Sequence, residues 1–315
     1  MNQIRLVANK RYWEKGIPYV NEVIFKPIST EDVRFLALRA ADLDVVEVLP
    51  FGVVDDIKKG KYPEIKLAPA PVAGYRMIKM NVEAPYFNNP KVRRAVAYAI
   101  ERKAYIDGVA FGHGEPAYQV NPKGHKWYLD DVKNLEMDLE KAKALLAEAG
   151  HPSGFKSFIE SRQGEEGEAA IIQSQLKKIG IELEIRSMDF AQLRKITLDG
   201  QYNIRASGSD VYSDIDRALH TNFHSEVERR VRNHTGYKNP EVDRLLDRAR
   251  IVSNTSERRE IYRKATEIIN NDSPQVNLAF IVEYFGYRAN VKGFTTNPNG
   301  RLSFPEGGIP VTWLE

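Results

Sequence analysis

The 315-residue sequence predicts an α/β protein in which mixed sheets are flanked by helices. Strand-like and helix-like segments alternate in two parts of the chain, a pattern typical of helices packed on sheets. The first part runs strand, helix, strand over residues 21–49, and the second repeats strand and helix between Phe155 and Ser207. Two layers of this kind predict an α/β architecture for most of the chain.

Residues 21–28 have the composition of a strand followed by a turn, and Asp44 to Leu49 of a short buried strand. Between them, Thr30 to Ala41 has helical spacing. The residues expected to face inward from this helix are Val33, Leu36, Ala37 and Ala40. A proline-rich segment from Pro63 to Gly74 then leads into a strand over residues 75–82.

Several helices have clear starting residues. Asn89 is a good N-cap before Pro90, because proline at the first helical position loses no hydrogen bond. Asp138 caps a second helix, which Gly150 ends. Asp189 and Gln192 have the spacing of a capping box. The residues that follow each of these starts are therefore expected to form helices.

Further strands and helices are predicted between Phe155 and residue 287. Ile181 to Ser187 alternates strictly between apolar and charged residues, which predicts a half-buried strand. Strands are also expected over residues 157–161 and 202–206. Amphipathic helices follow from Asn239-Pro240 and from Ser256, and residues 275–287 are expected to form one long strand.

The composition excludes several classes of function. Lys and Arg (46) barely outnumber Asp and Glu (43) and are interspersed with them, so no basic stripe for nucleic acid is expected. No cysteine is present, which excludes disulfides and thiolate metal sites. No apolar run approaches the length of a membrane span, and the N-terminus lacks the apolar stretch of a signal peptide.

No catalytic motif is found. The sequence lacks a Gly-x-Ser-x-Gly nucleophile elbow and a glycine-rich phosphate loop. His220 and His224 are four residues apart, but Thr221 stands where a zinc protease has glutamate, so a pair of surface histidines is expected. Asp216 is expected to cap a helix and Asp214 to bond its own loop. We therefore expect no catalytic residues, no metal and no cofactor.

Five segments resemble, in order, the dipeptide- and oligopeptide-binding proteins, family 5 of the bacterial extracellular solute-binding proteins. The first contains the Tyr12-Trp13 pair and the second a helix with the sequence Val92-Arg93-Arg94-Ala95-Val96. The five segments are residues 6–19, 87–102, 138–152, 235–243 and 291–294. They extend over nearly the whole chain.

The resemblance implies a periplasmic-binding-protein-like (class II) fold that clamps its solute between two lobes. Residues 1–75 and 281–315 would form a partial first lobe, and residues 76–280 the opposing ligand-binding lobe. The chain would then be an N-terminally truncated receptor that lacks part of the first lobe. The full-length protein would be periplasmic or an extracellular lipoprotein, monomeric, and would deliver solute to the permease subunits of an ABC importer.

The resemblance also implies candidate ligand-binding residues. Residues 207–216 match the family's ligand loop, but Val211 and Gly208 stand where peptide receptors have an acid and a tryptophan. Arg162 matches an arginine that some dipeptide receptors present to the ligand carboxylate. The alternative, on an equal footing, is that Arg162 is a solvated side chain at the end of a strand. The candidates are Arg162, Ser161, Ser209, Asp210, Tyr212 and Trp127.

These residues leave the solute open between a small peptide and an oligosaccharide. A peptide amino terminus needs a carboxylate, and Asp210 lies one residue before Val211, the position where peptide receptors have that acid. A sugar needs aromatic side chains such as Tyr212 or Trp127. Two further classes remain as alternatives: a truncated remnant or interaction fragment without ligand capture, and, less favoured, a hydrolase.

Overall fold

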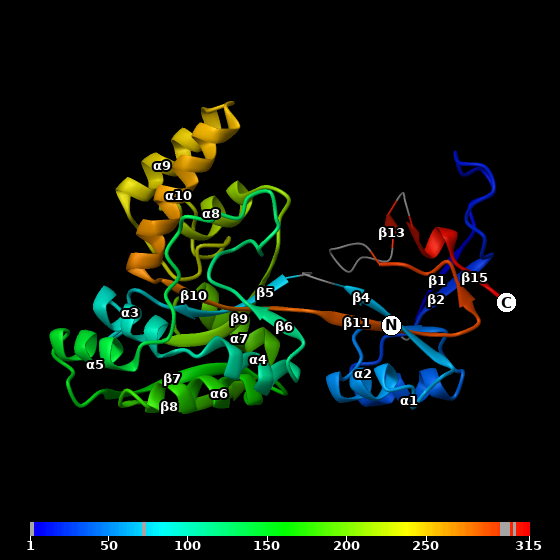
Figure 1. Ribbon diagram of the computed structural model, residues 1–315, viewed down its shortest axis with the longest axis horizontal. Helices are drawn as coiled ribbons and strands as arrows, with labels where there is room; N and C mark the ends of the chain where they lie inside the picture. The colour runs from blue at the N-terminus through cyan, green and yellow to red at the C-terminus, as the bar shows by residue number, and fades with distance from the viewer. Residues whose placement is uncertain (1–2, 71–73, 297–302, 305–306) are drawn as a thin grey trace. The chain divides into compact units, whose positions relative to one another are not determined.

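The computed structural model describes residues 3–70, 74–296, 303–304 and 307–315 (Figure 1). The chain folds into two compact units. Unit 1 consists of Met1–Ala73 and Ile281–Glu315, and unit 2 of Gly74–Phe280. Within the described residues, no helix combines the length and apolar character needed to cross a membrane.

Unit 1 is built on a three-stranded antiparallel sheet. Its central strand is β11 (Glu283–Arg288), which pairs with β3 (Val45–Val46) on one side and β4 (Ile65–Ala70) on the other. The helices α1 (Glu31–Arg39) and α2 (Phe51–Lys58) cover the sheet. Their buried side chains form a core with those of the sheet, namely Phe35, Leu38, Val46, Leu49, Val54, Ile57 and Ile65.

Three two-stranded ribbons complete the described part of unit 1. They are β1 (Ile4–Val7) with β2 (Glu22–Phe25), β12 (Val291–Lys292) with β15 (Trp313–Leu314), and β13 (Ser303–Phe304) with β14 (Gly307–Gly308). A short 3-10 helix, η1, spans Ile309–Val311. A cavity of about 810 Å³ lies beside the first two ribbons. Its lining is mostly apolar.

The buried face of α1 differs from the sequence prediction. Val33 and Leu36 were expected to face inward, yet they are 49% and 56% exposed, whereas Phe35 and Leu38 are buried. Two apolar stripes run along this short helix. The stripe that carries the aromatic ring packs on the core, because Phe35 also contacts Tyr62 edge to face at 5.2 Å between ring centroids.

Unit 2 contains a six-stranded mixed sheet in the order β6-β10-β5-β9-β7-β8. β7 is parallel to both β8 and β9, whereas β5 is antiparallel to β9 and β10. The bounds of the strands are β5 Gly74–Met80, β6 Gly114–Pro116, β7 Phe155–Arg162, β8 Ile181–Met188, β9 Ile204–Asp210 and β10 Gln275–Ile281.

Helices lie on both faces of this sheet. α6 packs on β7, β8 and β9, and α7 packs on β7, while α9 and α10 lie side by side with α8 against α9 (Figure 1). The bounds are α3 Pro90–Ala99, α4 Arg102–Ala110, α5 Leu139–Glu148, α6 Glu166–Lys177, α7 Phe190–Leu198, α8 Ile215–Phe223, α9 Pro240–Ile251 and α10 Thr255–Asp272. The predicted α/β architecture, a mixed sheet flanked by helices, is confirmed.

Four predicted helix caps are confirmed. The side chains of Asn89, Asp138, Asp189 and Asn239 each accept a hydrogen bond from a backbone N–H in the first turn of the following helix. The cap of α8 was assigned to the wrong residue. Asp214, not Asp216, is the N-cap, and it accepts from the Asp216 N–H at 2.9 Å. Asp216 bonds Tyr262 and Arg250 instead.

The single long strand predicted over residues 275–287 was also wrong. The segment forms two strands, because β10 pairs with β5 in unit 2 whereas β11 pairs with β3 and β4 in unit 1. Each unit therefore receives one strand from this segment, and in each sheet that strand lies between two others.

The register of α1 can be tested with a matched pair of variants. Replacing the fully buried Leu38 by alanine should cost about 2–5 kcal/mol of unfolding free energy, because it leaves a cavity in the unit 1 core. Leu36→Ala, on the exposed side of the same helix, should change it by less than about 0.5 kcal/mol. Urea denaturation followed by circular dichroism measures both, and equal losses would contradict the observed register.

Candidate functional site

Four of the predicted site residues lie at the carboxyl edge of the unit 2 sheet. Ser161 and Arg162 end β7, and Ser209 and Asp210 end the adjacent parallel strand β9. Successive side chains of a strand point to opposite faces. Because Glu160 is opposite Arg205, Arg162 and Ser209 share one face of the sheet, whereas Ser161 and Asp210 lie on the other.

The helices identify these two faces. Arg205 donates a hydrogen bond to Thr197 of α7, and Arg162 lies 5.4 Å from the ring centre of Phe190 at the start of the same helix. The opposite face contacts α6, because Arg76 on β5 approaches Glu168 to 4.0 Å. We call the α7 side the polar face. It carries Glu160 and Arg162 of β7, Arg205, Ser207 and Ser209 of β9, and Tyr75, Met77 and Lys79 of β5.

Arg162 is the accessible cation of the polar face. Its side chain is 52% exposed and forms an ion pair with Glu165 at 3.4 Å, three residues on. A surface pair of this kind contributes little to stability. The guanidinium is therefore available to bind a carboxylate in place of Glu165.

On the same face as Arg162, three polar groups are buried close together. The hydroxyls of Tyr75 and Ser209 and the side-chain oxygen of Gln275 form no hydrogen bond of regular geometry within the described residues. Tyr75 and Ser209 are direct cross-strand neighbours. Burial raises the pKa of Tyr75 to about 12, although the nearby Gln275 and Ser209 partly offset this rise. Unpaired buried groups are costly, and a polar ligand can satisfy them.

The other end of the polar face carries buried ionisable groups. Lys79 lies opposite Arg205 in the register of β5 and β9, and Glu160 lies opposite Arg205 on β7. Burial, then Arg205 and Arg232, lower the pKa of Lys79 to about 7. Burial raises the pKa of the Glu160 carboxyl to about 7, despite the Asn203 N–H that points at it.

None of these three residues was a sequence candidate. A usable signal existed at Lys79, since it stands between Ile78 and Met80 in a mostly apolar strand whose other charged residue, Arg76, is three positions away. The signal at Arg205 was weaker, because charged residues alternate with apolar ones in many half-exposed strands.

Asp210 ends β9, and Tyr212 lies on the loop that follows. Asp210 is exposed, and the Arg217 guanidinium lies 4.5 Å from the ring centre of Tyr212, which is half-buried. One face of this ring is therefore occupied by a cation rather than free to stack on a sugar. Both residues stay predictions as ligand contacts.

Trp127 is only 6% exposed, and its ring is already packed. It contacts Tyr262 edge to face at 5.8 Å, and Arg258 lies 5.1 Å from its centre. The indole N–H has no hydrogen-bond partner in the described part of the chain. Trp127 thus packs inside unit 2 against Tyr262 and Arg258. Its contact with a ligand stays a prediction.

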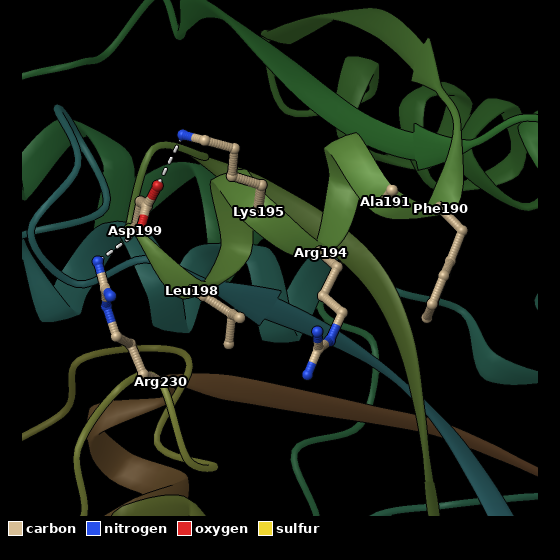
Figure 2. A pocket seen from close by; sticks show the side chains of 7 residues that line it. All are labelled: Phe190, Ala191, Arg194, Lys195, Leu198, Asp199 and Arg230. Carbon is tan, nitrogen blue, oxygen red and sulfur yellow. Dashed lines mark hydrogen bonds and ion pairs between the residues drawn. The ribbon is translucent and has the colours of Figure 1, made fainter.

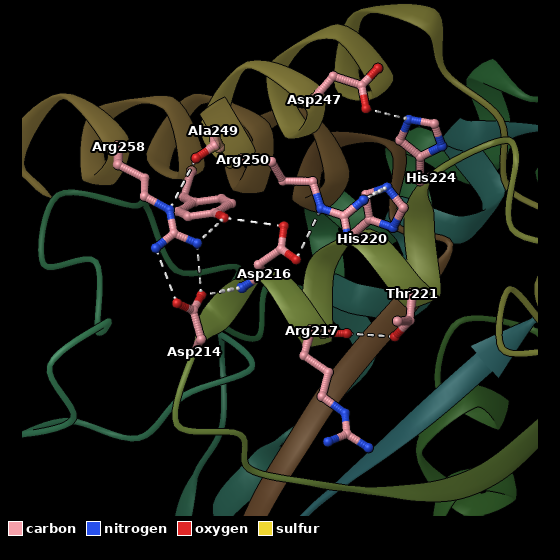
Figure 3. Close-up of polar contacts among 11 residues, drawn as sticks. Asp214, Asp216, Arg217, His220, Thr221, His224, Asp247, Ala249, Arg250 and Arg258 are labelled. Carbon is pink, nitrogen blue, oxygen red and sulfur yellow. Dashed lines mark hydrogen bonds and ion pairs between the residues drawn. The ribbon is translucent and has the colours of Figure 1, made fainter. Parts of the chain in front are cut away.

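Arg258 of α10 reaches Asp214 in the loop after β9 (Figure 3), and it also lies over the ring of Trp127. It donates to both carboxylate oxygens of Asp214, at 3.0 and 3.1 Å, to the Ala249 carbonyl at 3.0 Å and to the Tyr262 hydroxyl at 3.0 Å. A bidentate pair of this kind fixes orientation as well as distance. Arg258 therefore sets where the loop ends and α8 begins.

The histidine pair lies beyond this contact (Figure 3). The ligand atoms of His220, His224 and Asp247 are within 4.8 Å of one another. His224 is 2% exposed, so the expectation of two surface histidines was wrong. Its Nδ1 accepts the Glu226 N–H at 3.2 Å, which leaves the proton on Nε2 toward Asp247. Arg250 lies 2.9 Å from His220 Nε2. A metal ion would have to displace these contacts.

A cavity of about 540 Å³ borders α7 (Figure 2). Phe190, Arg194 and Leu198 project from one side of the helix toward it, and Arg230 reaches it from the loop that follows α8. Lys195 and Arg230 both pair with Asp199, at 2.9 and 3.0 Å. The lining therefore carries three cations and one carboxylate.

A two-unit α/β chain with a polar sheet face is the architecture of solute-binding proteins, and the comparisons agree. The family described as "Bacterial extracellular solute-binding proteins, family 5 Middle" matches residues 1–228. The chain belongs to this family, as the sequence motifs predicted.

Characterised relatives are similar over nearly the whole chain. Glutathione-binding protein GsiB of Escherichia coli (strain K12) is 28% identical over 322 residues, which cover 98% of this chain and 62% of the relative. Heme-binding protein A of Haemophilus influenzae is 30% identical over 309 residues, which cover 96% of this chain and 56% of that relative. The chain thus spans less than two thirds of the length of these proteins.

Solved structures confirm the periplasmic-binding-protein-like fold. DppA from Helicobacter pylori, in complex with the peptide STSA, gives a TM-score of 0.85 at 29% identity and covers 100% of this chain and 60% of its own. AgaA from A. tumefaciens R10, in complex with agropinic acid, gives a TM-score of 0.86 at 30% identity. This match covers 100% of the present chain and 65% of AgaA.

Arg258 should prove necessary for an ordered ligand loop. Arg258→Ala removes the bidentate pair with Asp214 and the cation over Trp127, and we expect a loss of about 1–2 kcal/mol of stability. Amide hydrogen exchange should rise in residues 210–216. Arg248→Ala, which breaks only an exposed pair with Glu257, should do neither. Unchanged exchange in the Arg258 variant would refute this role.

Glu160 should make stability depend on pH. Its pKa is 4.5 for an ordinary glutamate and about 7 in the folded chain. The folded state therefore binds one more proton between these values, and stability falls as pH rises from about 4.5 to 7. The fall should be at most about 3 kcal/mol. In Glu160→Gln this part of the pH dependence should disappear. Urea denaturation at pH 5 and pH 8 measures the difference, and an unchanged slope would contradict it.

Proposed function

We propose that this chain is the solute-capturing part of a receptor for an ABC importer, with a small peptide as the solute. Family membership supports this role. The observation that carries it is the placement of Arg162, Tyr75 and Ser209 on one polar face at the carboxyl edge of a sheet, where open α/β sheets bind ligands. No covalent chemistry is required of these residues.

Affinity would come from burying the solute against this face. Arg162 would bind the peptide carboxylate, and the unpaired hydroxyls of Tyr75 and Ser209 would accept or donate hydrogen bonds to its backbone. Asp210, at the end of β9, and Tyr212, on the loop that follows, would contact the other end. A peptide is favoured over an oligosaccharide, because the ring faces of Tyr212 and Trp127 are already in contact with arginines.

The wider setting follows from the family. We propose that residues 76–280 form the ligand-binding lobe, and residues 1–75 with 281–315 the opposing one. The receptor would be monomeric, would work in the periplasm or outside the cell, and would pass its solute to permease subunits. Its relatives are named for solutes that they bind, and DppA was solved with a peptide. Capture without hydrolysis is the activity we propose.

Isothermal titration calorimetry of this chain against di- to tetrapeptides tests the proposal. Arg162→Ala should weaken peptide binding at least tenfold, because the carboxylate loses its cation. Lys156→Ala, which changes an exposed cation at the other end of the same strand, should leave affinity unchanged. Peptides should be recovered intact after incubation. Absence of binding by every peptide, or equal losses in both variants, would overturn the proposal.

A further inference from the structure

The deep end of the polar face holds basic side chains that have no paired carboxylate among the described residues. Lys79 is 5% exposed, and in that part of the chain its amine has a single hydrogen-bond partner, the neutral side-chain oxygen of Asn222 at 3.3 Å. A buried ammonium group is costly unless a negative charge compensates it. Asn222 lies in the last turn of α8, where the helix dipole offers only partial compensation.

Two arginines add to these basic side chains. Arg205 is the cross-strand neighbour of Lys79, and it donates only to the Thr197 hydroxyl and the Ala206 carbonyl. Arg232, in the loop after α8, is close enough for its charge to lower the pKa of both Lys79 and His234. Within the described residues, no carboxylate lies within ion-pair distance of Lys79, Arg205 or Arg232.

The nearby titratable groups do not correct the balance. Burial, then Lys79 and the surrounding arginines, lower the pKa of His234 to about 3, so this histidine is neutral at physiological pH. Glu160, opposite Arg205, is the nearest carboxyl in register, and burial raises its pKa to about 7. Glu165 and Glu168 also act on the charge of Arg205, but they pair with Arg162 and Arg76. Within the described residues, no carboxylate is therefore committed to Lys79 and Arg205. Arg102, another buried cation of unit 2, is instead surrounded by backbone carbonyl oxygens.

We propose that Lys79 and Arg205 form an oxyanion-binding subsite, which receives an acidic group of the captured solute. The subsite is separate from Arg162, since Lys79 and Arg205 lie nearer the opposite ends of their strands. Arg205 is half-buried and gives the subsite contact with solvent. The preferred solute would then be a peptide with an acidic side chain. This choice of solute rests on the proposed function, whereas the binding of an anion does not.

Sulfate is a suitable probe of the subsite alone. Low-millimolar sulfate, with sodium chloride at equal ionic strength as the reference, should raise the melting temperature of the chain at pH 6. Lys79→Met should melt higher than wild type without sulfate, because a buried unpaired charge is gone, and its apparent sulfate Kd should rise at least tenfold. Lys156→Met, at an exposed lysine, should respond to sulfate as the wild type does.

A retained sulfate response in Lys79→Met, or an equal response to chloride, would overturn the subsite. The higher melting temperature expected of the variant separates loss of binding from loss of folding. Arg205→Gln provides a second variant on the neighbouring strand, and it too should lose most of the sulfate response.

Calorimetry with the dipeptides Ala-Glu and Ala-Gln then identifies the source of the anion. Wild type should bind Ala-Glu at least tenfold more tightly, and Lys79→Met should bind both equally. Equal binding of both by wild type would overturn the acidic solute and leave peptide capture intact. Binding of neither dipeptide, together with a sulfate response that needs Lys79, would overturn peptide capture and retain the anion subsite.

Discussion

The antiparallel pairing of β5 with β9 determines the properties of unit 2. This ladder joins residues 74–80 to residues 204–210 and fixes which side chains share a face. A shift of one residue would send Lys79 and Tyr75 to the α6 side and bring Arg76 to the polar face. The two ends of the ladder thus acquire different chemistry: unpaired hydroxyls beside Ser209, and unpaired cations beside Arg205. Both the proposed peptide site and the proposed anion subsite depend on this register.

A second constraint acts on the loops around this sheet. Arg258 reaches the N-cap of α8, the end of α9 and the ring of Trp127, so one side chain links three separate segments. Loops positioned by a rigid scaffold are the usual location of binding residues. Here the scaffold is completed by a side chain from a distant helix. The loop after β9 is consequently held at its end by the ion pair between Arg258 and Asp214.

The sequence was a good guide to elements and a poorer guide to faces. Caps such as Asn89 and Asp138 are local, because a side chain and the N–H two or three residues later are sufficient to form them. The face of α1 depends on which stripe fits the core, and a nine-residue helix with two apolar stripes does not specify that by itself. The ends of β7 and β9 were identified by family resemblance, yet Lys79 and Arg205 meet only through strand pairing. Arg258 likewise has no local signal, since its partners lie in other segments.

The position of β11 has a consequence for how the chain is made. β11 is the middle strand of the unit 1 sheet, and it lies near the C-terminus, whereas its neighbours β3 and β4 lie near the N-terminus. During synthesis the first 70 residues emerge early but cannot close their sheet until residues 283–288 arrive. In unit 2, β7, β8 and β9 pair within residues 155–210, and β10 inserts between β5 and β6 only after residues 275–281 arrive. The unit 1 sheet therefore closes late, from contacts of large sequence separation, which are slow to form.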